Sequence, residues 1–340
     1  MKSIFKSLLA VIFLFLLAVS CREEIINYSG FDGFVQGTTY RIVYGSASDF
    51  DVEEMQTLVQ NRLRDFDMSL SLYEDSSVLS KINRNESLKT DKYFTEAFKI
   101  SKELWAMTEG AFDITVGPLV KAWGFGPDAI QNYRESSRDS LLAIVGFGKV
   151  SIRDGSVLKS DPRISLDFNA VAQGYSVDVI CSLLDSMDIR HYLVEIGGEV
   201  RVKGMRDNRQ WRIGIDRPVD NNLFPGEDIQ AIINLQDKAL ATSGNYRKFY
   251  VKDGVKYSHT IDPRSGYPVS NQLLSATIIA DECAVADGIA TACMVMGKDE
   301  SIAFLQRYTE FEAYLIFSDE NGNFRTWTSE SLKKSISESE

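Results

Sequence analysis

Apolar residues recur along the chain at two different spacings. From Asp51 to Met68 and from Asp91 to Thr108 they return every three to four residues, which predicts two amphipathic helices. From Phe34 to Tyr44 they alternate with outward polar residues, which predicts a strand. The run from Cys283 to Met296 is almost wholly apolar and predicts a buried helix.

Shorter stretches predict the remaining elements. Residues 192–200 indicate a hairpin turned at Gly197-Gly198, residues 110–119 a junction between a strand and a helix, and residues 166–184 a loop that enters a helix. Further strands are expected at 211–215, 231–235, 248–252 and 276–280, with a closing hairpin at 313–317 and 324–327. Strands in runs with inserted helices predict an α+β fold with mixed or antiparallel sheets.

The N-terminus carries the pattern of a targeting segment. Lys2 and Lys6 precede an apolar run, Leu8 to Val19, that is too short for a comfortable bilayer span. The segment Ala18-Val19-Ser20-Cys21 resembles the lipobox of a bacterial lipoprotein signal. The resemblance implies acylation of Cys21 and a membrane anchor, while a plain secretory signal with an incidental cysteine is the alternative.

These observations divide the chain into four parts. We expect a signal peptide at 1–20, a lipidated tether at 21–30, one domain at 31–330 and a polar tail at 331–340. Removal of residues 1–20 takes away two lysines and no acidic residue, so the net charge goes from −11 to −13. An acidic domain of this kind is not a general nucleic-acid binder, and it needs a metal or backbone amides to hold a phosphate-bearing substrate.

Cysteine and histidine usage limits the chemistry further. Beyond Cys21 the chain has Cys181, Cys283 and Cys293, all in apolar surroundings, which favours buried free thiols over a disulfide framework. With only His191 and His259, a histidine-rich zinc or iron site is excluded.

The strongest candidate chemistry lies between residues 240 and 297. Asp287 and Thr291 are four residues apart in the apolar run, so on a helix they share one face. Asp281 is the better candidate for the N-cap, which leaves Asp287 without a capping role. A buried carboxylate needs a partner, and Mg²⁺ that also holds substrate phosphates would provide one. Ser243-Gly244-Asn245 is either an ordinary turn or an anion nest of backbone amides beside that ion.

A second group of residues offers a base and a binding surface. His259 precedes the turn Asp262-Pro263-Arg264-Ser265-Gly266 and either accepts a proton from an attacking hydroxyl or bonds to backbone. Small residues between Asp167 and Gln173 allow a close approach of backbone to a ligand, and Tyr73 offers a ring on which a planar heterocycle can stack.

Taken in order, the motifs of the chain resemble the ApbE family of FAD:protein FMN transferases. The motifs are Gly37-Thr38, Ser71-x-Tyr73, Gly110-Ala111-Phe112-Asp113, Asp167 to Tyr175, Ile196-Gly197-Gly198, Thr242 to Tyr246, His259 to Pro263, and Ala286-Asp287-x-x-x-Thr291. The resemblance implies an ApbE-like, T-fold-related architecture and an extracytoplasmic lipoprotein, most simply on the inner membrane facing the periplasm. It also implies Mg²⁺-dependent transfer of the FMN half of FAD to a threonine hydroxyl of a partner flavoprotein, with release of AMP. The acceptors implied are subunits of redox complexes.

The resemblance also assigns roles to single residues. His259 becomes the base toward the acceptor threonine, and Asp287 acts in catalysis through the metal, which would be held by Asp287, Thr291 and the backbone carbonyl of Ala170. The implied flavin and pyrophosphate contacts are Gln36, Tyr73, Ala111, Phe112, Asp113, Asp167, Gln173, Ser243 and Ile261.

Other functions use the same residues. With water as the acceptor, the site would make an FAD pyrophosphatase that yields FMN and AMP. A lipoprotein that binds FAD without catalysis would retain the intact dinucleotide. An envelope lipoprotein with no ligand would leave Asp287 without a partner in an apolar helix.

Overall fold

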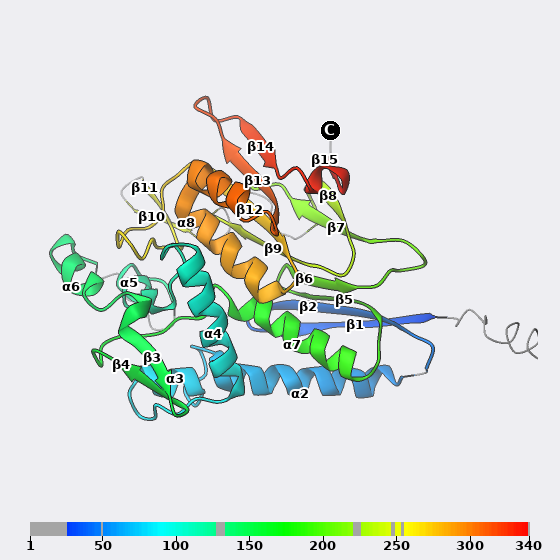
Figure 1. The fold of residues 1–340 in the computed structure, drawn as a ribbon, viewed down its shortest axis with the longest axis horizontal. Coiled ribbons are helices and arrows are strands. Elements are labelled where there is room, and N and C mark those ends of the chain that lie inside the picture. Colours follow the sequence, from blue (N-terminus) through cyan, green and yellow to red (C-terminus); the bar gives the residue numbers. More distant parts are fainter. Residues whose placement is uncertain are drawn as a thin grey trace, which may run out of the picture.

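The centre of the fold is one eight-stranded sheet. The computed structural model describes residues 26–48, 50–126, 133–219, 226–245, 249–252 and 255–338 (Figure 1). Every strand pairs antiparallel to its neighbour, in the order β1-β2-β5-β6-β9-β12-β13-β14. The strands are β1 (Asn27–Val35), β2 (Thr38–Ser46), β5 (His191–Ile196), β6 (Glu199–Lys203), β9 (Ala239–Gly244), β12 (Leu273–Ala280), β13 (Glu312–Ser318) and β14 (Phe324–Thr328).

The helices are inserted between these strands, which confirms the α+β prediction. They are α2 (Val52–Leu70), α3 (Val78–Asn83), α4 (Lys92–Met107), α5 (Gly117–Ala122), α6 (Arg138–Leu142), α7 (Ala172–Ser186) and α8 (Cys283–Arg307), with 3₁₀ turns η1 (Ile114–Val116), η2 (Glu135–Ser137), η3 (Phe147–Lys149) and η4 (Leu332–Lys334). Asp51 and Asp91 cap α2 and α4 through their side chains, so both predicted helices begin where the sequence indicated.

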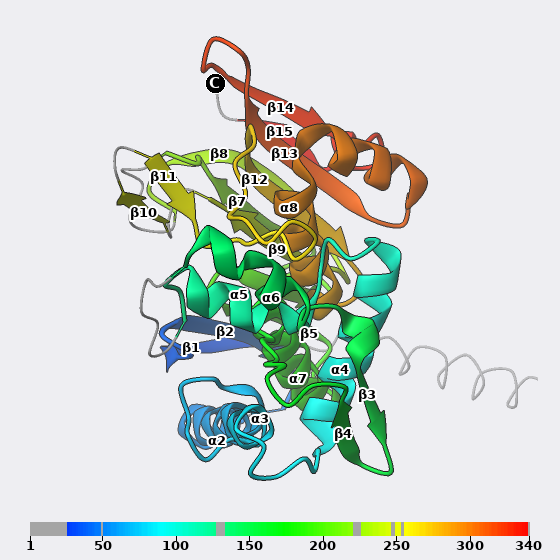
Figure 2. The same cartoon turned by 90° about the vertical axis from the view of Figure 1, so that its left-hand side faces the viewer.

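The two faces of the main sheet are covered differently, because side chains of a strand point alternately to opposite faces. In β12, Ile278 packs with α4 and α8, whereas Ile279 packs with a smaller sheet on the other side. Figure 2 shows α8 and that smaller sheet on either side of β12. The smaller sheet is formed by β7 (Trp211–Asp216), β8 (Ile229–Leu235) and β15 (Ile336–Glu338).

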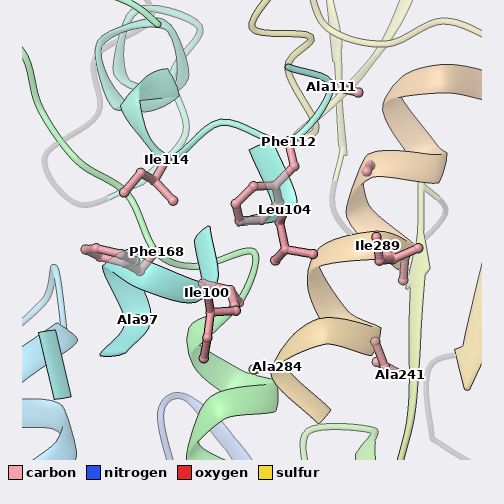
Figure 3. Close-up of a cluster of buried hydrophobic side chains, with 14 of the residues drawn as sticks. Ala97, Ile100, Leu104, Ala111, Phe112, Ile114, Phe168, Ala241, Ala284 and Ile289 are labelled. Atoms are coloured by element: carbon pink, nitrogen blue, oxygen red, sulfur yellow. The ribbon is translucent and has the colours of Figure 1, made fainter. Parts of the chain in front are cut away.

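On the helical face, the core joins α4 and α8 to the sheet. Leu104, Phe112 and Ile289 are buried there, and Figure 3 shows their side chains converging between the two helices. A second cluster packs α2 and α7 against β2 and β5, and Figure 1 shows α7 between α2 and the sheet. Within the described residues, no helix is both long and apolar enough to cross a bilayer.

Four expectations need correction. Residues 34–44 are the end of β1, a turn and most of β2, because Gln36 and Gly37 adopt φ of 53° and 74° and reverse the chain. Residues 110–119 hold no strand: the buried Asp113 caps η1, and α5 follows directly. Residues 243–244 end β9 and are not part of a free turn. Residues 336–338 of the expected polar tail pair with β8.

The remaining strand predictions are confirmed within a few residues. The hairpin at 192–200 is β5–β6, and the closing hairpin is β13–β14. Two further hairpins, β3 (Val150–Arg153) with β4 (Ser156–Lys159) and β10 (Phe249–Lys252) with β11 (Val255–Ser258), lie outside the main sheet. Cys181, Cys283 and Cys293 are buried and free, as predicted. Cys21 and the signal segment lie outside the described residues.

Candidate active site

The carboxylate of Asp287 lies at the contact between α7 and α8. Asp287 is buried, and its Oδ2 accepts a hydrogen bond of 3.0 Å from the backbone N–H of Gly174. That N–H belongs to the first turn of α7, so it has no partner within its own helix. Burial raises the pKa of Asp287 to about 7, against the opposing effect of the Gly174 N–H. The structure therefore holds a desolvated carboxylate with one backbone donor on it.

Gly174 is what allows the two helices to approach so closely. A Cβ atom at this position would lie 2.4 Å from the carbonyl oxygen of Cys283 and 2.8 Å from Cβ of Asp287. Real Cβ atoms do not come that close to such neighbours, so only glycine fits here without a shift of α7 or α8. The small residues before Gly174 were expected to permit a close approach of backbone, and Gly174 itself does so.

The N-terminus of α8 is capped from another helix. The expected cap, Asp281, instead pairs with Lys238 at 2.6 Å. Asp178 of α7 accepts bonds from the N–H groups of Cys283 and Ala284 at 3.0 and 2.9 Å. It also forms an ion pair with Arg201 of β6 at 2.5 Å. The sequence contains a signal for this cap, because Asp178 lies four residues after Gly174, on the same face of an apolar helix.

The two other expected metal donors, Thr291 and Ala170, lie on α8 and in the turn before α7. Thr291 follows Asp287 by one turn of α8, and its hydroxyl lies 3.3 Å from Oγ of Ser243 at the end of β9. Ala170 lies in the turn just before α7, four residues before Gly174. The structure thus places a carboxylate, two hydroxyls and a chain turn along the α7–α8 contact.

The loop at Ala111, Phe112 and Asp113 is packed against the same helix. Ala111 and Phe112 are buried in the core, with the Phe112 ring beside Gly288, so any contact they make with a ligand would come from their backbone. Asp113 accepts bonds from the N–H and hydroxyl of Thr115 and from the N–H of Phe147. Burial raises its pKa. Its carboxylate fixes the shape of this loop.

Asp167 joins that loop to the segment before α7. Its N–H donates to the carbonyl of Ile114 at 2.7 Å, and its Oδ1 accepts from the N–H of Asn169 at 2.8 Å. Burial raises the pKa of Asp167. Tyr73 lies close enough that burial and the charge of Asp167 together raise the pKa of its phenol, although the side chain is exposed.

Gln36 and Gln173 both lie within hydrogen-bonding distance of the Ser176 hydroxyl. The hydroxyl of Ser176 donates to the Gln173 carbonyl at 2.7 Å and lies 3.4 Å from Oε1 of Gln36. The side chain of Gln173 packs against Gly197 in the β5–β6 turn, where a Cβ atom would overlap Nε2. Two of the expected contact residues therefore lie at one end of the sheet, beside the start of α7.

His259 lies on a hairpin of its own. The segment around Thr260 and Ile261 pairs back on Pro268 and Val269, with a bond of 2.9 Å from the Val269 N–H to the Thr260 carbonyl. The His259 ring contacts the edge of the Phe125 ring, at 6.4 Å between centroids. Ile261 is buried against α5 in a small cluster with Leu119 and Val145.

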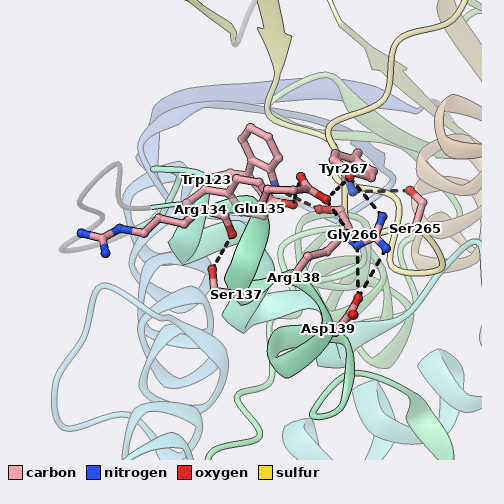
Figure 4. Close-up of polar contacts among 10 residues, drawn as sticks. Trp123, Arg134, Glu135, Ser137, Arg138, Asp139, Ser265, Gly266 and Tyr267 are labelled. Atoms are coloured by element: carbon pink, nitrogen blue, oxygen red, sulfur yellow. Dashed lines mark hydrogen bonds and ion pairs between the residues drawn. The ribbon is translucent and has the colours of Figure 1, made fainter.

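Hydrogen bonds and an ion pair hold the turn of this hairpin from two sides. The Tyr267 hydroxyl donates to Glu135 at 2.5 Å and accepts from Arg138 at 3.0 Å, and the Trp123 indole N–H donates to the Gly266 carbonyl at 2.9 Å (Figure 4). On the other side, Arg264 bonds to Glu300 of α8 at 2.9 Å. Glu300 follows Gly297, where a φ of 75° breaks the helix, so the hairpin is anchored to the part of α8 beyond the segment that carries Asp287.

Comparison with known proteins identifies this arrangement. The sequence model of the ApbE family matches residues 36–315, which include every expected contact residue from Gln36 to Thr291. The chain belongs to the ApbE family. The match also covers all four elements described above: the β1–β2 turn, α7, the His259 hairpin and α8.

Relatives of this ApbE family member share most of their length with it. It is 37% identical over 313 residues to an FAD:protein FMN transferase of Vibrio cholerae, covering 90% of this chain and 92% of the relative. It is 32% identical to an FAD:protein FMN transferase of Haemophilus influenzae, with 98% of both chains covered.

Solved structures agree with the fold. The flavin transferase ApbE from Vibrio cholerae superposes with a TM-score of 0.81 at 34% identity, covering 92% of this chain and 100% of the other. The apo form of the flavinyl transferase ApbE from Pseudomonas stutzeri also gives a TM-score of 0.81, at 30% identity and with 91% and 96% covered. The ApbE-like architecture expected from the motifs is therefore confirmed.

Proposed function

We propose that this FAD:protein FMN transferase depends on Mg²⁺ and transfers FMN to a threonine hydroxyl of the acceptor. Family membership and the names of its relatives support the enzyme class. The observation that carries the site is Asp287, a buried carboxylate with a Gly174 N–H and, within the described residues, no lysine or arginine paired to it.

The donors around Asp287 suit a hard divalent cation. A carboxylate, the Thr291 hydroxyl and a backbone carbonyl such as that of Ala170 are all oxygen donors, which Mg²⁺ prefers. Within the described residues, no group of three or more acidic, histidine or cysteine side chains is placed to hold a metal ion, so this part of the chain offers no closed cage of such ligands. Such a donor set fits an ion that is shared with substrate phosphates and water. When bound, Mg²⁺ would neutralise charge on the FAD pyrophosphate.

The proposed FAD contacts form a path along the site. Gln36 and Gln173 lie at the sheet end, Tyr73 and Asp167 lie near one another, and the backbone of residues 111–113 lies against α8. Ile261 ends the path on the His259 hairpin. An exposed Tyr73 ring is available for stacking on a planar heterocycle.

The proposed transfer step forms one bond and breaks one bond. The acceptor hydroxyl oxygen bonds to the phosphorus of the FMN half, the bond from that phosphorus to the bridging oxygen breaks, and AMP leaves with that oxygen. The hydroxyl proton passes to His259, which is half-buried and held on a fastened hairpin. General bases of this kind typically contribute about 10²- to 10⁴-fold to the rate.

The test is a comparison of six reactions, three proteins each with and without Mg²⁺. Wild-type protein is incubated with FAD and a threonine-bearing acceptor domain, with and without Mg²⁺, and so are Asp287→Ala and His259→Ala. We expect the acceptor to gain the mass of FMN and AMP to appear only with wild type and Mg²⁺. Full activity of Asp287→Ala would overturn the metal assignment, and full activity of His259→Ala would overturn the base.

The same experiment separates the alternatives. An FAD pyrophosphatase would release AMP and FMN at the same rate with or without the acceptor and would leave the acceptor mass unchanged. A binding protein would retain intact FAD and release no AMP. Attachment at Cys21 to the outer side of a membrane belongs to this proposal as well, and the lipobox-like segment before Cys21 supports it.

A further inference from the structure

A groove beside the proposed FAD path runs between the β1–β2 turn and α2. Its volume is about 500 Å³, and its lining includes Phe34, Gln36 and Tyr40 from the hairpin and Leu63, Asp67 and Met68 from α2. Protein sites for small ligands or for a few side chains have volumes of this order. The proposed reaction uses only Gln36 of these residues.

Tyr40 brings an unsatisfied polar group to this groove. Only 2% of Tyr40 is exposed, and no described residue forms a hydrogen bond with its buried hydroxyl. The ring lies across Gly33, where a Cβ atom would be 2.4 Å from the hydroxyl oxygen. A buried hydroxyl that has lost water and gained no hydrogen-bond partner destabilises the folded state. Among the described tyrosines with a buried, unpaired hydroxyl, Tyr40 is the one that lines this groove.

The rim of the groove is apolar and exposed. Phe34 is 73% exposed and Met68 is 40% exposed, and both line the groove. Single exposed apolar residues are common, but a gathering of aromatic and methionine side chains is typical of a protein interface.

Gln36 makes the groove continuous with the proposed site. Its Nε2 donates to Oδ1 of Asp67 at 3.0 Å on the groove side. Its Oε1 faces Ser176, which in turn bonds the carbonyl of Gln173. A chain lying in the groove would therefore reach the proposed flavin contacts at Gln36 without crossing another element.

The charges in the groove favour a peptide over FAD as its occupant. Asp67 and Glu74 both line it, with Arg64 as the one cation among the lining residues. Burial and the charge of Glu74 raise the pKa of Asp67, against the opposing bond from Gln36. Two carboxylates against one guanidinium disfavour the anionic halves of FAD and favour a neutral or basic peptide.

We propose that this groove receives an extended segment of the acceptor protein, next to the residue that takes FMN. The segment places an apolar side chain between Phe34 and Met68 and a backbone N–H or carbonyl on the Tyr40 hydroxyl. This inference rests on the proposed transferase function, since only a transferase needs a protein acceptor at Gln36.

The experiment varies acceptor and FAD separately. For Phe34→Ala and Tyr40→Phe, the rate of FMN attachment is measured against acceptor-domain concentration at saturating FAD, and against FAD at saturating acceptor. Loss of an interface anchor costs more than about 1 kcal/mol, so we expect KM for the acceptor to rise roughly five- to tenfold. KM for FAD and AMP release without acceptor should stay at wild-type values.

The chain supplies a matched control for each variant. Tyr44 lies on the same strand as Tyr40 and is also buried with an unpaired hydroxyl, but it does not line the groove. Phe324 is 41% exposed on β14, at the opposite edge of the same sheet. Tyr44→Phe and Phe324→Ala should leave every one of these constants unchanged.

Two results would overturn the groove assignment. One is an unchanged KM for the acceptor in both groove variants. The other is a rise in KM for FAD instead, which would give the groove to the dinucleotide. A wild-type protein that attaches no FMN would count against the proposed function alone. In that case, calorimetric titration of a Thr→Ala acceptor domain into wild type and Phe34→Ala decides the groove by itself: weaker binding to the variant supports it and equal binding refutes it.

Discussion

At the scale of single residues, the behaviour of the site depends on a carboxylate that the fold has made costly to ionise. Asp287 is buried, and the Gly174 N–H offsets only part of the cost of desolvating its charge. A cation would supply the missing compensation, and it would have to displace a proton from Asp287 at low pH. Metal binding and protonation at this residue are therefore linked.

This linkage predicts a pH dependence of metal binding. The pKa of Asp287 is raised from 3.8 to about 7, so below about pH 7 the metal competes with one proton. We expect the apparent affinity for Mn²⁺, used as a spectroscopic substitute for Mg²⁺, to fall up to about tenfold per unit as the pH falls below 7. Titration followed by electron paramagnetic resonance at pH 5.5, 6.5 and 7.5 measures it.

The metal-free protein provides the control. Between about pH 4 and 7 the folded state holds a proton on Asp287 that the unfolded state has lost, so the free energy of unfolding should decrease as pH rises through this window. Asp287→Asn cannot titrate, and the difference between wild type and this variant isolates the contribution. A difference that is the same at pH 5 and pH 7.5 would contradict the raised pKa.

At the scale of elements, α8 is positioned by α7 and not by its own cap residue. Glu282 makes no side-chain cap, whereas Asp178 reaches across to the first two N–H groups of α8 and is itself paired with Arg201. Together with the bond from Gly174 to Asp287, this fixes the register of one helix on the other. That register determines where Asp287 and Thr291 lie along the α7–α8 contact.

We therefore predict that Asp178→Ala is strongly destabilising. It removes a buried cap and leaves Arg201 without its partner, and breaking a buried pair typically costs about 3–5 kcal/mol. Urea unfolding followed by circular dichroism measures the change in the free energy of unfolding.

A neighbouring pair serves as the control for that variant. Asp185 is also on α7 and pairs with Lys203 of β6 at 2.7 Å, but its side chain is 41% exposed, against 12% for that of Asp178. Asp185→Ala should cost less than about 1 kcal/mol, since exposed ion pairs contribute little. Equal losses for the two variants would mean that the helix cap adds nothing.

The elements themselves were largely predictable, and the exceptions are instructive. Helices α2 and α4 follow from apolar periodicity and a capping aspartate, which are local signals. The β1–β2 hairpin was missed because the sequence Gln36-Gly37 lacks the strong turn pairs, although Gly37 permits the positive φ that the turn needs. Strand β9 was missed because it is short, and its sheet neighbours β6 and β12 are distant in sequence.

At the scale of the whole molecule, the described domain contains every residue of the proposed site. The expected contacts run from Gln36 to Thr291, and the described structure begins at residue 26. The proposed anchor, Cys21, comes before the first described strand. The proposed anchor and the proposed catalytic residues therefore lie in separate parts of the chain.

This separation predicts the effect of removing the anchor. Cys21→Ser should move the protein from the membrane fraction to the soluble extracytoplasmic fraction, because in this proposal acyl chains on Cys21 would provide the membrane affinity. The rate of FMN attachment to a soluble acceptor domain should stay within about twofold of wild type, since the catalytic residues lie elsewhere. Fractionation tests the predicted change of location, and an intact-mass assay of the acceptor tests the predicted rate. A variant that remains in the membrane fraction would contradict acylation at Cys21.

The sequence alone determined the chemistry available to this protein and the local elements that carry it. The pair Asp287 and Thr291, the histidine at 259 and the ApbE motifs are all legible as residues and spacings. Only the tertiary structure decided that Asp178 caps α8, that Asp113 shapes its own loop, and that Tyr40 brings an unpaired hydroxyl to a groove beside Gln36. These features depend on contacts between segments far apart in the chain. The spacing of apolar residues predicts only which face of its own helix or strand a residue lies on.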